Sequence, residues 1–229
     1  MGLAQASGSE TGANGLQQSI QSLQQALDIN PLDPSTLNTC GTVYLQAGLQ
    51  SPDPAARTNQ ISKAIPFFQQ AAQLAPNYPE AYCGLGRCSF LLGDPQKAQG
   101  LYQKALRMNP HNGRTYMYLG ELHYRLKNLE RAYQDFAAAA ALDMKNIEAR
   151  KNVGLVLTLL GRKDEAIREY LEALNRAPGD LVILRRLASL YFARGDDSNG
   201  TAFARRAYDA TPPAQKGSFD TFVTDLHQK

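Results

Sequence analysis

The residues of this chain that could act as nucleophiles, general acids or metal ligands are few and widely spaced. The three histidines and three cysteines stand at His111, His123, His227, Cys40, Cys83 and Cys88. Cys83 and Cys88 are five positions apart, which matches no common zinc site, and an odd number of cysteines does not suit a disulfide framework. We therefore expect free, buried thiols in a reducing compartment and no metal site.

The charged residues follow the spacing of helix surfaces and not that of a catalytic set. Glu121 and Arg125, like Glu165 and Glu169, are four positions apart, as are neighbours on one face of a helix. The chain contains no glycine-rich phosphate loop, no dinucleotide-binding motif and no H-E-x-x-H zinc motif. The sequence thus predicts no catalytic residue, no cofactor and no enzymatic activity. His123 falls in an aromatic position of the pattern described below, so we expect it to be packed in the core.

Composition indicates a soluble protein without a nucleic-acid or membrane surface. The 229 residues are 43% hydrophobic and 20% charged, enough for one or two domains with a core. The net charge is only +3 and no long Lys/Arg run occurs, so we expect neither a nucleic-acid partner nor membrane insertion. Residues 1–15 hold four glycines and no apolar stretch of a secretory signal. We expect a disordered tail or an artificial leader there, and a cytoplasmic location.

The elements that position the side chains are indicated by a repeat of about 34 residues. Four kinds of position, here called slots, recur in register. The first small slot holds Gly86, Gly120, Gly154 and Ala188, and the second holds Ala98, Ala132, Ala166 and Gly200. The aromatic slot holds Tyr102, Phe136, Tyr170 and Ala204, and the proline slot holds Pro110, Met144, Pro178 and Pro212. Such a period is typical of one helical unit repeated along the chain.

This pattern resembles the tetratricopeptide repeat family, whose motif runs W-x2-L-G-x2-Y, then A-x3-F, then P. The best match is Tyr82, Leu85, Gly86, Ser89, Ala98, Tyr102 and Pro110, although the family's tryptophan is absent. The resemblance implies an all-α solenoid, a right-handed superhelix of antiparallel helix pairs, with about twelve helices and a capping helix at each end. It places a half repeat at 16–33 and repeats at 34–78, 79–112, 113–146, 147–180 and 181–214.

Two repeats depart from the pattern. In 34–78, eleven extra residues follow Gly48, which we align with the turn glycines Gly93, Gly161 and Gly195. We expect 50–58 to form a surface loop that the fold does not need, functional or neutral. We also expect the second helix of this repeat to start near 62–65, because Pro66 is best tolerated in a first turn. Repeat 181–214 lacks both the alanine and the aromatic residue of the second helix.

Apolar stripes at both ends predict capping helices. Near the C-terminus, in 215–229, the stripe consists of Phe219, Phe222, Val223 and Leu226. At the other end it consists of Leu16, Ile20, Leu23 and Leu27. The C-terminal helix either covers the last repeat or detaches and docks on a partner, and the sequence leaves both open.

The resemblance implies that the first helix of each repeat lines a concave groove. The predicted groove residues are Asn38, Thr42, Arg87, Phe90, Arg114, Met117, Glu121, Tyr124, Lys151, Leu155, Arg185 and Phe192. Aromatic and arginine side chains together are typical of recognition surfaces. The alternative is that these residues pack against neighbouring helices and that their charges pair among themselves.

We therefore expect a non-enzymatic interaction module that holds a partner segment with acidic residues among apolar ones. The alternatives are a self-assembling scaffold and the helical part of a larger assembly, secretion or biosynthetic machine. Two specialisations within the family are disfavoured. The carboxylate clamp would need an asparagine where Leu155 follows Lys151, and only Asn152 fits the asparagine ladder of the sugar-transferring members.

Overall fold

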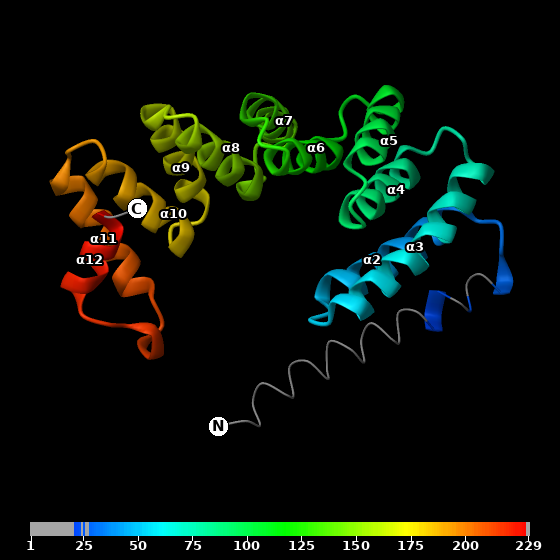
Figure 1. Ribbon diagram of the computed structural model, residues 1–229, viewed down its shortest axis with the longest axis horizontal. Coiled ribbons are helices and arrows are strands. Elements are labelled where there is room, and N and C mark those ends of the chain that lie inside the picture. Colours follow the sequence, from blue (N-terminus) through cyan, green and yellow to red (C-terminus); the bar gives the residue numbers. More distant parts are fainter. Residues whose placement is uncertain (1–20, 24, 26–27, 228–229) are drawn as a thin grey trace. The chain divides into compact units, whose positions relative to one another are not determined.

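The computed structural model describes residues 21–23, 25 and 28–227, and within these it contains helices and no strand (Figure 1). The chain divides into two compact units, residues 1–111 and 112–229. Leu16, Ile20, Leu27 and residues 1–15 lie outside the described part. Leu23 is described, and it packs against a cluster that contains Leu37 and Cys40.

The helices of each unit follow one another as antiparallel pairs. Unit 1 contains α2 (Pro34–Gln50), α3 (Pro54–Leu74), α4 (Pro79–Leu91) and α5 (Pro95–Met108). Unit 2 contains α6 (Gly113–Arg125), α7 (Leu129–Leu142), α8 (Ile147–Leu159), α9 (Lys163–Arg176), α10 (Leu181–Phe192), α11 (Asp197–Ala210) and α12 (Phe219–His227). A single 3-10 turn, Pro213–Gln215, precedes α12.

Local sequence fixes where these helices begin and end. An Asp or Asn side chain accepts a backbone N–H at the start of most of them, as Asp94 does from Lys97 before α5. The second helix of each pair ends two residues before the proline slot, and α7 ends there too although Met144 occupies the slot. The turns within the pairs contain Gly93, Gly161 and Gly195 at positive φ, and Lys127 at φ 61° in the equivalent position.

The glycines of the first small slot are sites of close helix approach. A Cβ at Gly86 would lie 2.6 Å from the ring of Tyr102, and a Cβ at Gly120 would lie 2.6 Å from the ring of Phe136. Each aromatic ring therefore fills the space over the glycine of its partner helix.

The expected loop at 50–58 is wrong, because these residues lengthen the helices of unit 1. Helix α2 has 17 residues and α3 has 21, against 13 and 14 in the α4/α5 pair. Only 51–53 remain between them, since Asp53 accepts the N–H groups of Ala55 and Ala56 and starts α3 at Pro54. The added turns pack on each other, with a Cβ at Gly48 only 2.7 Å from Ile61. In Figure 1, α2 and α3 lie side by side along their length.

Two further expectations for this pair are corrected. Gly48 lies inside α2 and is buried, so it is not a turn glycine. Pro66 lies inside α3, twelve positions after its first residue, and not in a first turn. It is tolerated because it is on the exposed face, where water can bind the Ser62 carbonyl that loses its N–H partner.

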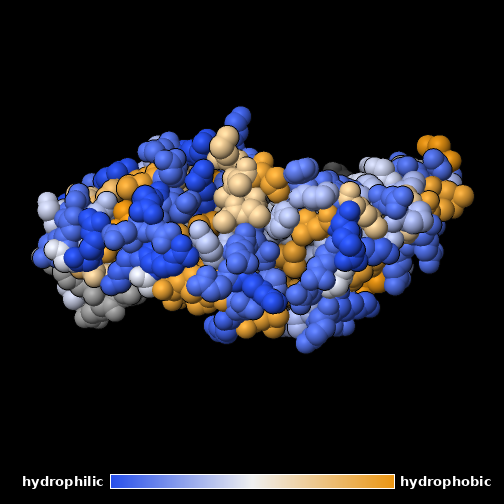
Figure 2. Space-filling model, turned by 90° about the horizontal axis from the view of Figure 1, so that it is seen from above, coloured by the Kyte–Doolittle hydropathy of each residue, from blue (hydrophilic) through white to orange (hydrophobic). Residues whose placement is uncertain are grey.

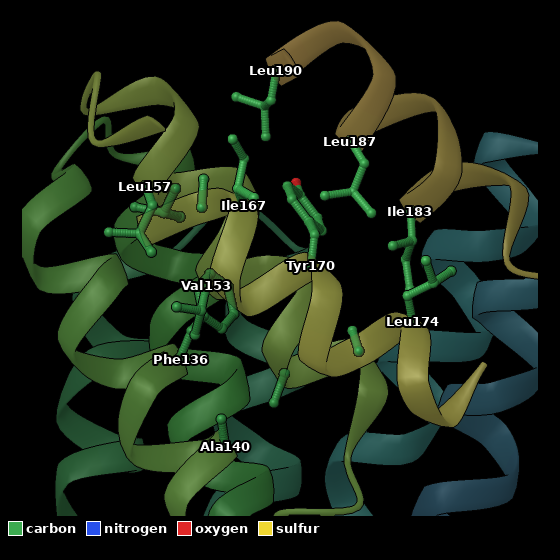
Figure 3. Packing of buried hydrophobic residues seen from close by; sticks show 14 of the residues in the cluster. Phe136, Ala140, Val153, Leu157, Ile167, Tyr170, Leu174, Ile183, Leu187 and Leu190 are labelled. Atoms are coloured by element: carbon green, nitrogen blue, oxygen red, sulfur yellow. The ribbon is translucent and has the colours of Figure 1, made fainter. Parts of the chain in front are cut away.

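The core of unit 2 runs between successive helix pairs. Ile167, Tyr170 and Leu174 of α9 face Ile183, Leu187 and Leu190 of α10 (Figure 3). These contacts bury apolar area between neighbouring pairs, which is the source of stability in repeat proteins.

In the last helix pair, α10 and α11, the aromatic ring and the small residue that it covers have exchanged helices. Ala188 and Ala204 occupy the first small slot and the aromatic slot, and both are buried. The ring instead belongs to Phe192 of α10, and it lies directly over Gly200 of α11. The pair therefore keeps one ring against one glycine, but on the opposite helices.

The C-terminal helix α12 covers this last pair, which confirms the capping interpretation. Leu226 is buried with Ala188 and Ala204, and Phe219, Phe222 and Val223 pack around them. No described helix is long and apolar enough to cross a membrane. On the face shown in Figure 2, hydrophobic residues are scattered among hydrophilic ones.

Candidate functional site

Four of the predicted groove residues line one pocket in unit 2. This pocket, called the α6–α8 pocket, has a volume of about 300 Å³. Its walls include Met117, Glu121, Tyr124, Phe136, Asn152 and Leu155. Met117, Glu121 and Tyr124 share one face of α6 because they are spaced i, i+4 and i+7, and Leu155 approaches from α8.

The apolar walls of the α6–α8 pocket are held in place by packing against the core of unit 2. Met117 and Tyr124 are half-buried and pack against the core cluster of unit 2. The Glu121 carboxylate lies 3.9 Å from Arg125 on the same helix. The pocket therefore offers fixed apolar surface beside a polar edge, an arrangement suited to binding one or two side chains of a partner.

A second pocket in unit 2, called the α10–α12 pocket, has a volume of about 490 Å³. Its walls include Thr158, Lys163, Arg185, Arg186, Phe222 and Leu226. Arg185 belongs to the predicted groove set. Thr158 lies one turn after Leu155 on α8, so the two pockets lie along the same stretch of this helix.

Lys151 is a structural residue, as in the alternative in which the charges of the predicted groove residues pair within the fold. Its side chain is only 17% exposed, and its Nζ lies 2.8 Å from Glu148 and 3.0 Å from Asp180. Asp180 also accepts the N–H groups of Val182 and Ile183 at the start of α10. Lys151 therefore ties α8 to the N-terminus of α10.

Both partners of this tie have shifted pKa values. Burial acts to lower the pKa of Lys151, but its bonds to Glu148 and Asp180 outweigh burial and raise it. Burial acts to raise the pKa of Asp180, but hydrogen bonds from Ile183 and Lys151 hold it below its ordinary value. Reversing the charge of Lys151 would therefore disturb the fold, so it cannot serve as a neutral test of binding.

Phe192 also lies apart from the α6–α8 pocket. Its ring covers Gly200 and packs with α12. For Phe192 and Lys151, the alternative of packing and internal pairing therefore describes the structure better than an open wall. Arg114 is exposed at the start of α6.

The remaining predicted residues belong to unit 1. Arg87 and Phe90 are half-buried on α4, with the Arg87 guanidinium carbon 5.6 Å from the centre of the Phe90 ring. On α2, the Thr42 hydroxyl donates to the Asn38 carbonyl, and Thr42 is exposed. These residues line neither the α6–α8 pocket nor the second pocket of unit 2 described above.

Sequence reasoning missed Lys163, Arg186, Phe222 and Leu226 as pocket residues. The slot pattern followed one stripe of the first helices, and Arg186 lies one position beside that stripe. Phe222 and Leu226 were recognised only as part of the capping stripe. The repeat pattern cannot predict a pocket formed by the last helix pair and the capping helix, because the capping helix occurs only once in the chain.

His123 and the three cysteines belong to the interior. His123 is only 7% exposed, and its Nδ1 lies 2.5 Å from the Asp135 carboxylate on α7. Burial raises the pKa of Asp135, against the lowering effect of His123. All three cysteines are buried and unbridged, and burial raises the pKa of Cys88 to about 12. These findings confirm a packed histidine and buried thiols.

Models of the tetratricopeptide repeat match residues 55–101, 92–147 and 147–180, which together span more than half of the chain. The human protein O-mannosyl-transferase TMTC3 is 27% identical over 129 residues, 55% of this chain and 14% of that protein. The BBSome complex member BBS4 of Bos taurus is 27% identical over 135 residues, 59% of this chain and 26% of that protein. The matched segment is thus a small part of each relative.

The fold is also similar to solved structures. The crystal structure of YrrB, described as a TPR protein with an unusual peptide-binding site, superposes with a TM-score of 0.66 at 19% identity. The similarity covers 92% of this chain and 100% of the YrrB chain. The described helices therefore form the same kind of helical-repeat solenoid.

Proposed function

The chain belongs to the tetratricopeptide repeat family, and from this premise we propose that it is a non-enzymatic interaction module. Unit 2 binds a segment of a partner protein on the face that α6 and α8 present. The partner segment places an apolar side chain in the α6–α8 pocket.

The observation that carries this proposal is the convergence of Met117, Glu121, Tyr124 and Leu155 on one pocket. Three of these side chains are apolar or aromatic, and each is half-buried and open on one side. Burying a leucine-sized side chain against such surface is worth about 1.5–3 kcal/mol. The pocket's volume of about 300 Å³ is large enough to hold an apolar side chain of a peptide.

The relatives support the broad class of function. One is named as a member of a protein complex, and the structural neighbour is described as having a peptide-binding site. TMTC3 is named a transferase, but the match covers only 14% of its length. Fold alone does not assign an activity, so the proposal rests on the pocket.

The test is selection of peptides from a random linear library displayed on phage. The wild-type chain is compared with Leu155→Glu, which places a charge in the α6–α8 pocket. The matched control is Leu159→Glu on the same helix, since Leu159 is 51% exposed and lies outside the pocket. We expect Leu155→Glu to bind the selected peptides at least tenfold more weakly, or about 1.4 kcal/mol, and Leu159→Glu to bind them as the wild type does.

Circular dichroism of all three proteins checks that the folds are equal. Equal binding by wild type and Leu155→Glu would place the peptide elsewhere and refute the assignment. If the wild type enriches no peptide while its mass rises with concentration, a self-assembling scaffold becomes the better description.

A further inference from the structure

The α10–α12 pocket gathers three cations from two helices of unit 2. Lys163 stands at the first position of α9, and Arg185 and Arg186 are neighbours on α10. Of the residues whose side chains the structure describes, no Asp or Glu lines this pocket. Its net charge is therefore positive, unlike that of the α6–α8 pocket, where Glu121 and Arg125 are both lining residues.

The three cations also lack carboxylate partners within the described part of the chain. The Lys163 ammonium donates to the Ala193 carbonyl at 3.1 Å, and the Arg185 guanidinium lies 4.7 Å from the centre of the Phe222 ring. Arg186 is exposed and makes no hydrogen bond or ion pair with the described residues.

Three other arginines of unit 2 are neutralised by nearby acids. Arg150 lies 3.1 Å from Glu169, Arg162 lies 2.7 Å from Glu165, and Arg194 lies 3.2 Å from Asp164. Those cations are satisfied within the fold, whereas the three cations of the α10–α12 pocket have no carboxylate partner among the described residues.

We propose that the α10–α12 pocket is a subsite that binds acidic side chains of the partner segment. This inference rests on the proposed function and adds the chemistry of the partner. Guanidinium groups form charge-assisted hydrogen bonds with carboxylates that are about twice as strong as neutral ones. The Lys163 ammonium adds a second donor beside them.

The apolar side of the pocket comes from the C-terminal helix. Phe222 and Leu226 of α12 form this wall, and the methylene groups of a glutamate or a neighbouring apolar residue can pack on it. Helix α12 is also held by an aromatic contact outside the pocket, since the Arg205 guanidinium lies 3.6 Å from the Phe219 ring centre. The capping helix is therefore also a wall of the binding site.

The partner's anionic group is a protein carboxylate and not a nucleic-acid backbone. Nucleic acids are bound by an extended basic stripe that neutralises many phosphates. Here three cations surround one pocket with an apolar wall, and the whole chain has a net charge of only +3.

The test extends the same peptide selection to Arg186→Glu and to the milder Arg186→Gln. Arg186 is chosen because Arg185 contacts α12. The control is Lys145→Glu, a charge reversal at an exposed position between α7 and α8 that lines neither pocket. Peptides selected on the wild type are expected to be enriched in Asp and Glu beside an apolar position. The Arg186 variants are expected to lose the acidic enrichment and keep the apolar one.

The second part of the test measures the affinities of one selected peptide and of its Glu→Gln derivative for the wild type and the variants. We expect the derivative to bind wild type and Lys145→Glu at least tenfold more weakly, and to bind Arg186→Gln almost as the parent does. Equal affinities for wild type, or an acidic enrichment unchanged in both Arg186 variants, would overturn the proposal. So would a short oligothymidine that binds more tightly than the peptide and depends on Arg186. Apolar enrichment without acids leaves the proposed function standing and refutes only this subsite, whereas no enrichment on the wild type refutes both.

Discussion

Replacing Gly86 by alanine tests the contact that sets the spacing within a helix pair. The new Cβ would lie 2.6 Å from the ring of Tyr102, where ordinary contacts begin near 3.4 Å. Tyr102 is fully buried, so its ring cannot move aside into solvent. Overpacking of this kind costs about 1–3 kcal/mol, whereas alanine in a helix interior gains about 1 kcal/mol over glycine.

Gly100 provides the matched control, because it lies on α5 of the same helix pair and a Cβ there would meet no atom within 4 Å. Gly100→Ala should therefore stabilise the protein by about 0.5–1 kcal/mol. Both variants share the gain in helix propensity, so the difference between them isolates the steric cost. We expect Gly86→Ala to be about 1–3 kcal/mol less stable than Gly100→Ala.

Urea unfolding followed by circular dichroism measures both variants in the same transition, because both glycines belong to unit 1. In a Tyr102→Leu background the penalty of Gly86→Ala should shrink, since the ring is its cause. If Gly86→Ala is stabilised as much as Gly100→Ala, the ring does not constrain the helix spacing and the reasoning fails.

Four further predictions concern the charged tie, the thiols and the long helix pair. Lys151→Glu should lower the free energy of unfolding by about 1–3 kcal/mol while Arg114→Glu changes it little, as measured by urea unfolding. Because the pKa of Asp180 is lowered in the folded state, its stabilisation is present above its ordinary pKa and is lost as pH falls through the folded value. Asp180→Asn keeps a capping side chain, so it should lose less stability than the wild type as the pH falls from about 5 to below 3.8. An equal loss in the two proteins would contradict this tie. Cys88 and the other thiols should not react with Ellman's reagent at neutral pH until urea unfolds the chain, and rapid reaction of the folded protein would contradict their burial. Deleting 50–58 should reduce helicity and melting temperature, and unchanged values would restore the loop interpretation.

The sequence predicted the helix pairs because their contacts are made by residue types that repeat. Gly86 with Tyr102 and Gly120 with Phe136 are recognisable from spacing alone, since each ring needs a missing Cβ opposite it. The eleven inserted residues were misjudged because Pro52 and Pro54 are typical of loops. Proline also suits the first position of a helix, and Asp53 supplies the cap that decides between the two.

The candidate site was predicted less completely than the fold. Tyr124 and Leu155 were found because their positions on successive first helices follow from the repeat. Lys151 was misplaced because its partner Asp180 is 29 residues away and fits no slot. Phe222 was identified as apolar but not as a pocket wall, since only packing against α10 determines which side of α12 stays open.

The exchanged contact in the last helix pair affects how the repeats can be counted. A motif scores each position by residue type, so Ala204 in place of a ring and Phe192 outside the pattern both count against a match. The matched segments end at residue 180, yet the α10/α11 pair continues the stack to Ala210. Geometry tolerates the exchange because the space between two helices depends on the combined volume of ring and glycine and not on which helix carries each. Searches that score facing positions jointly would recover such terminal repeats, and counts made from linear motifs are lower limits for solenoids of this kind.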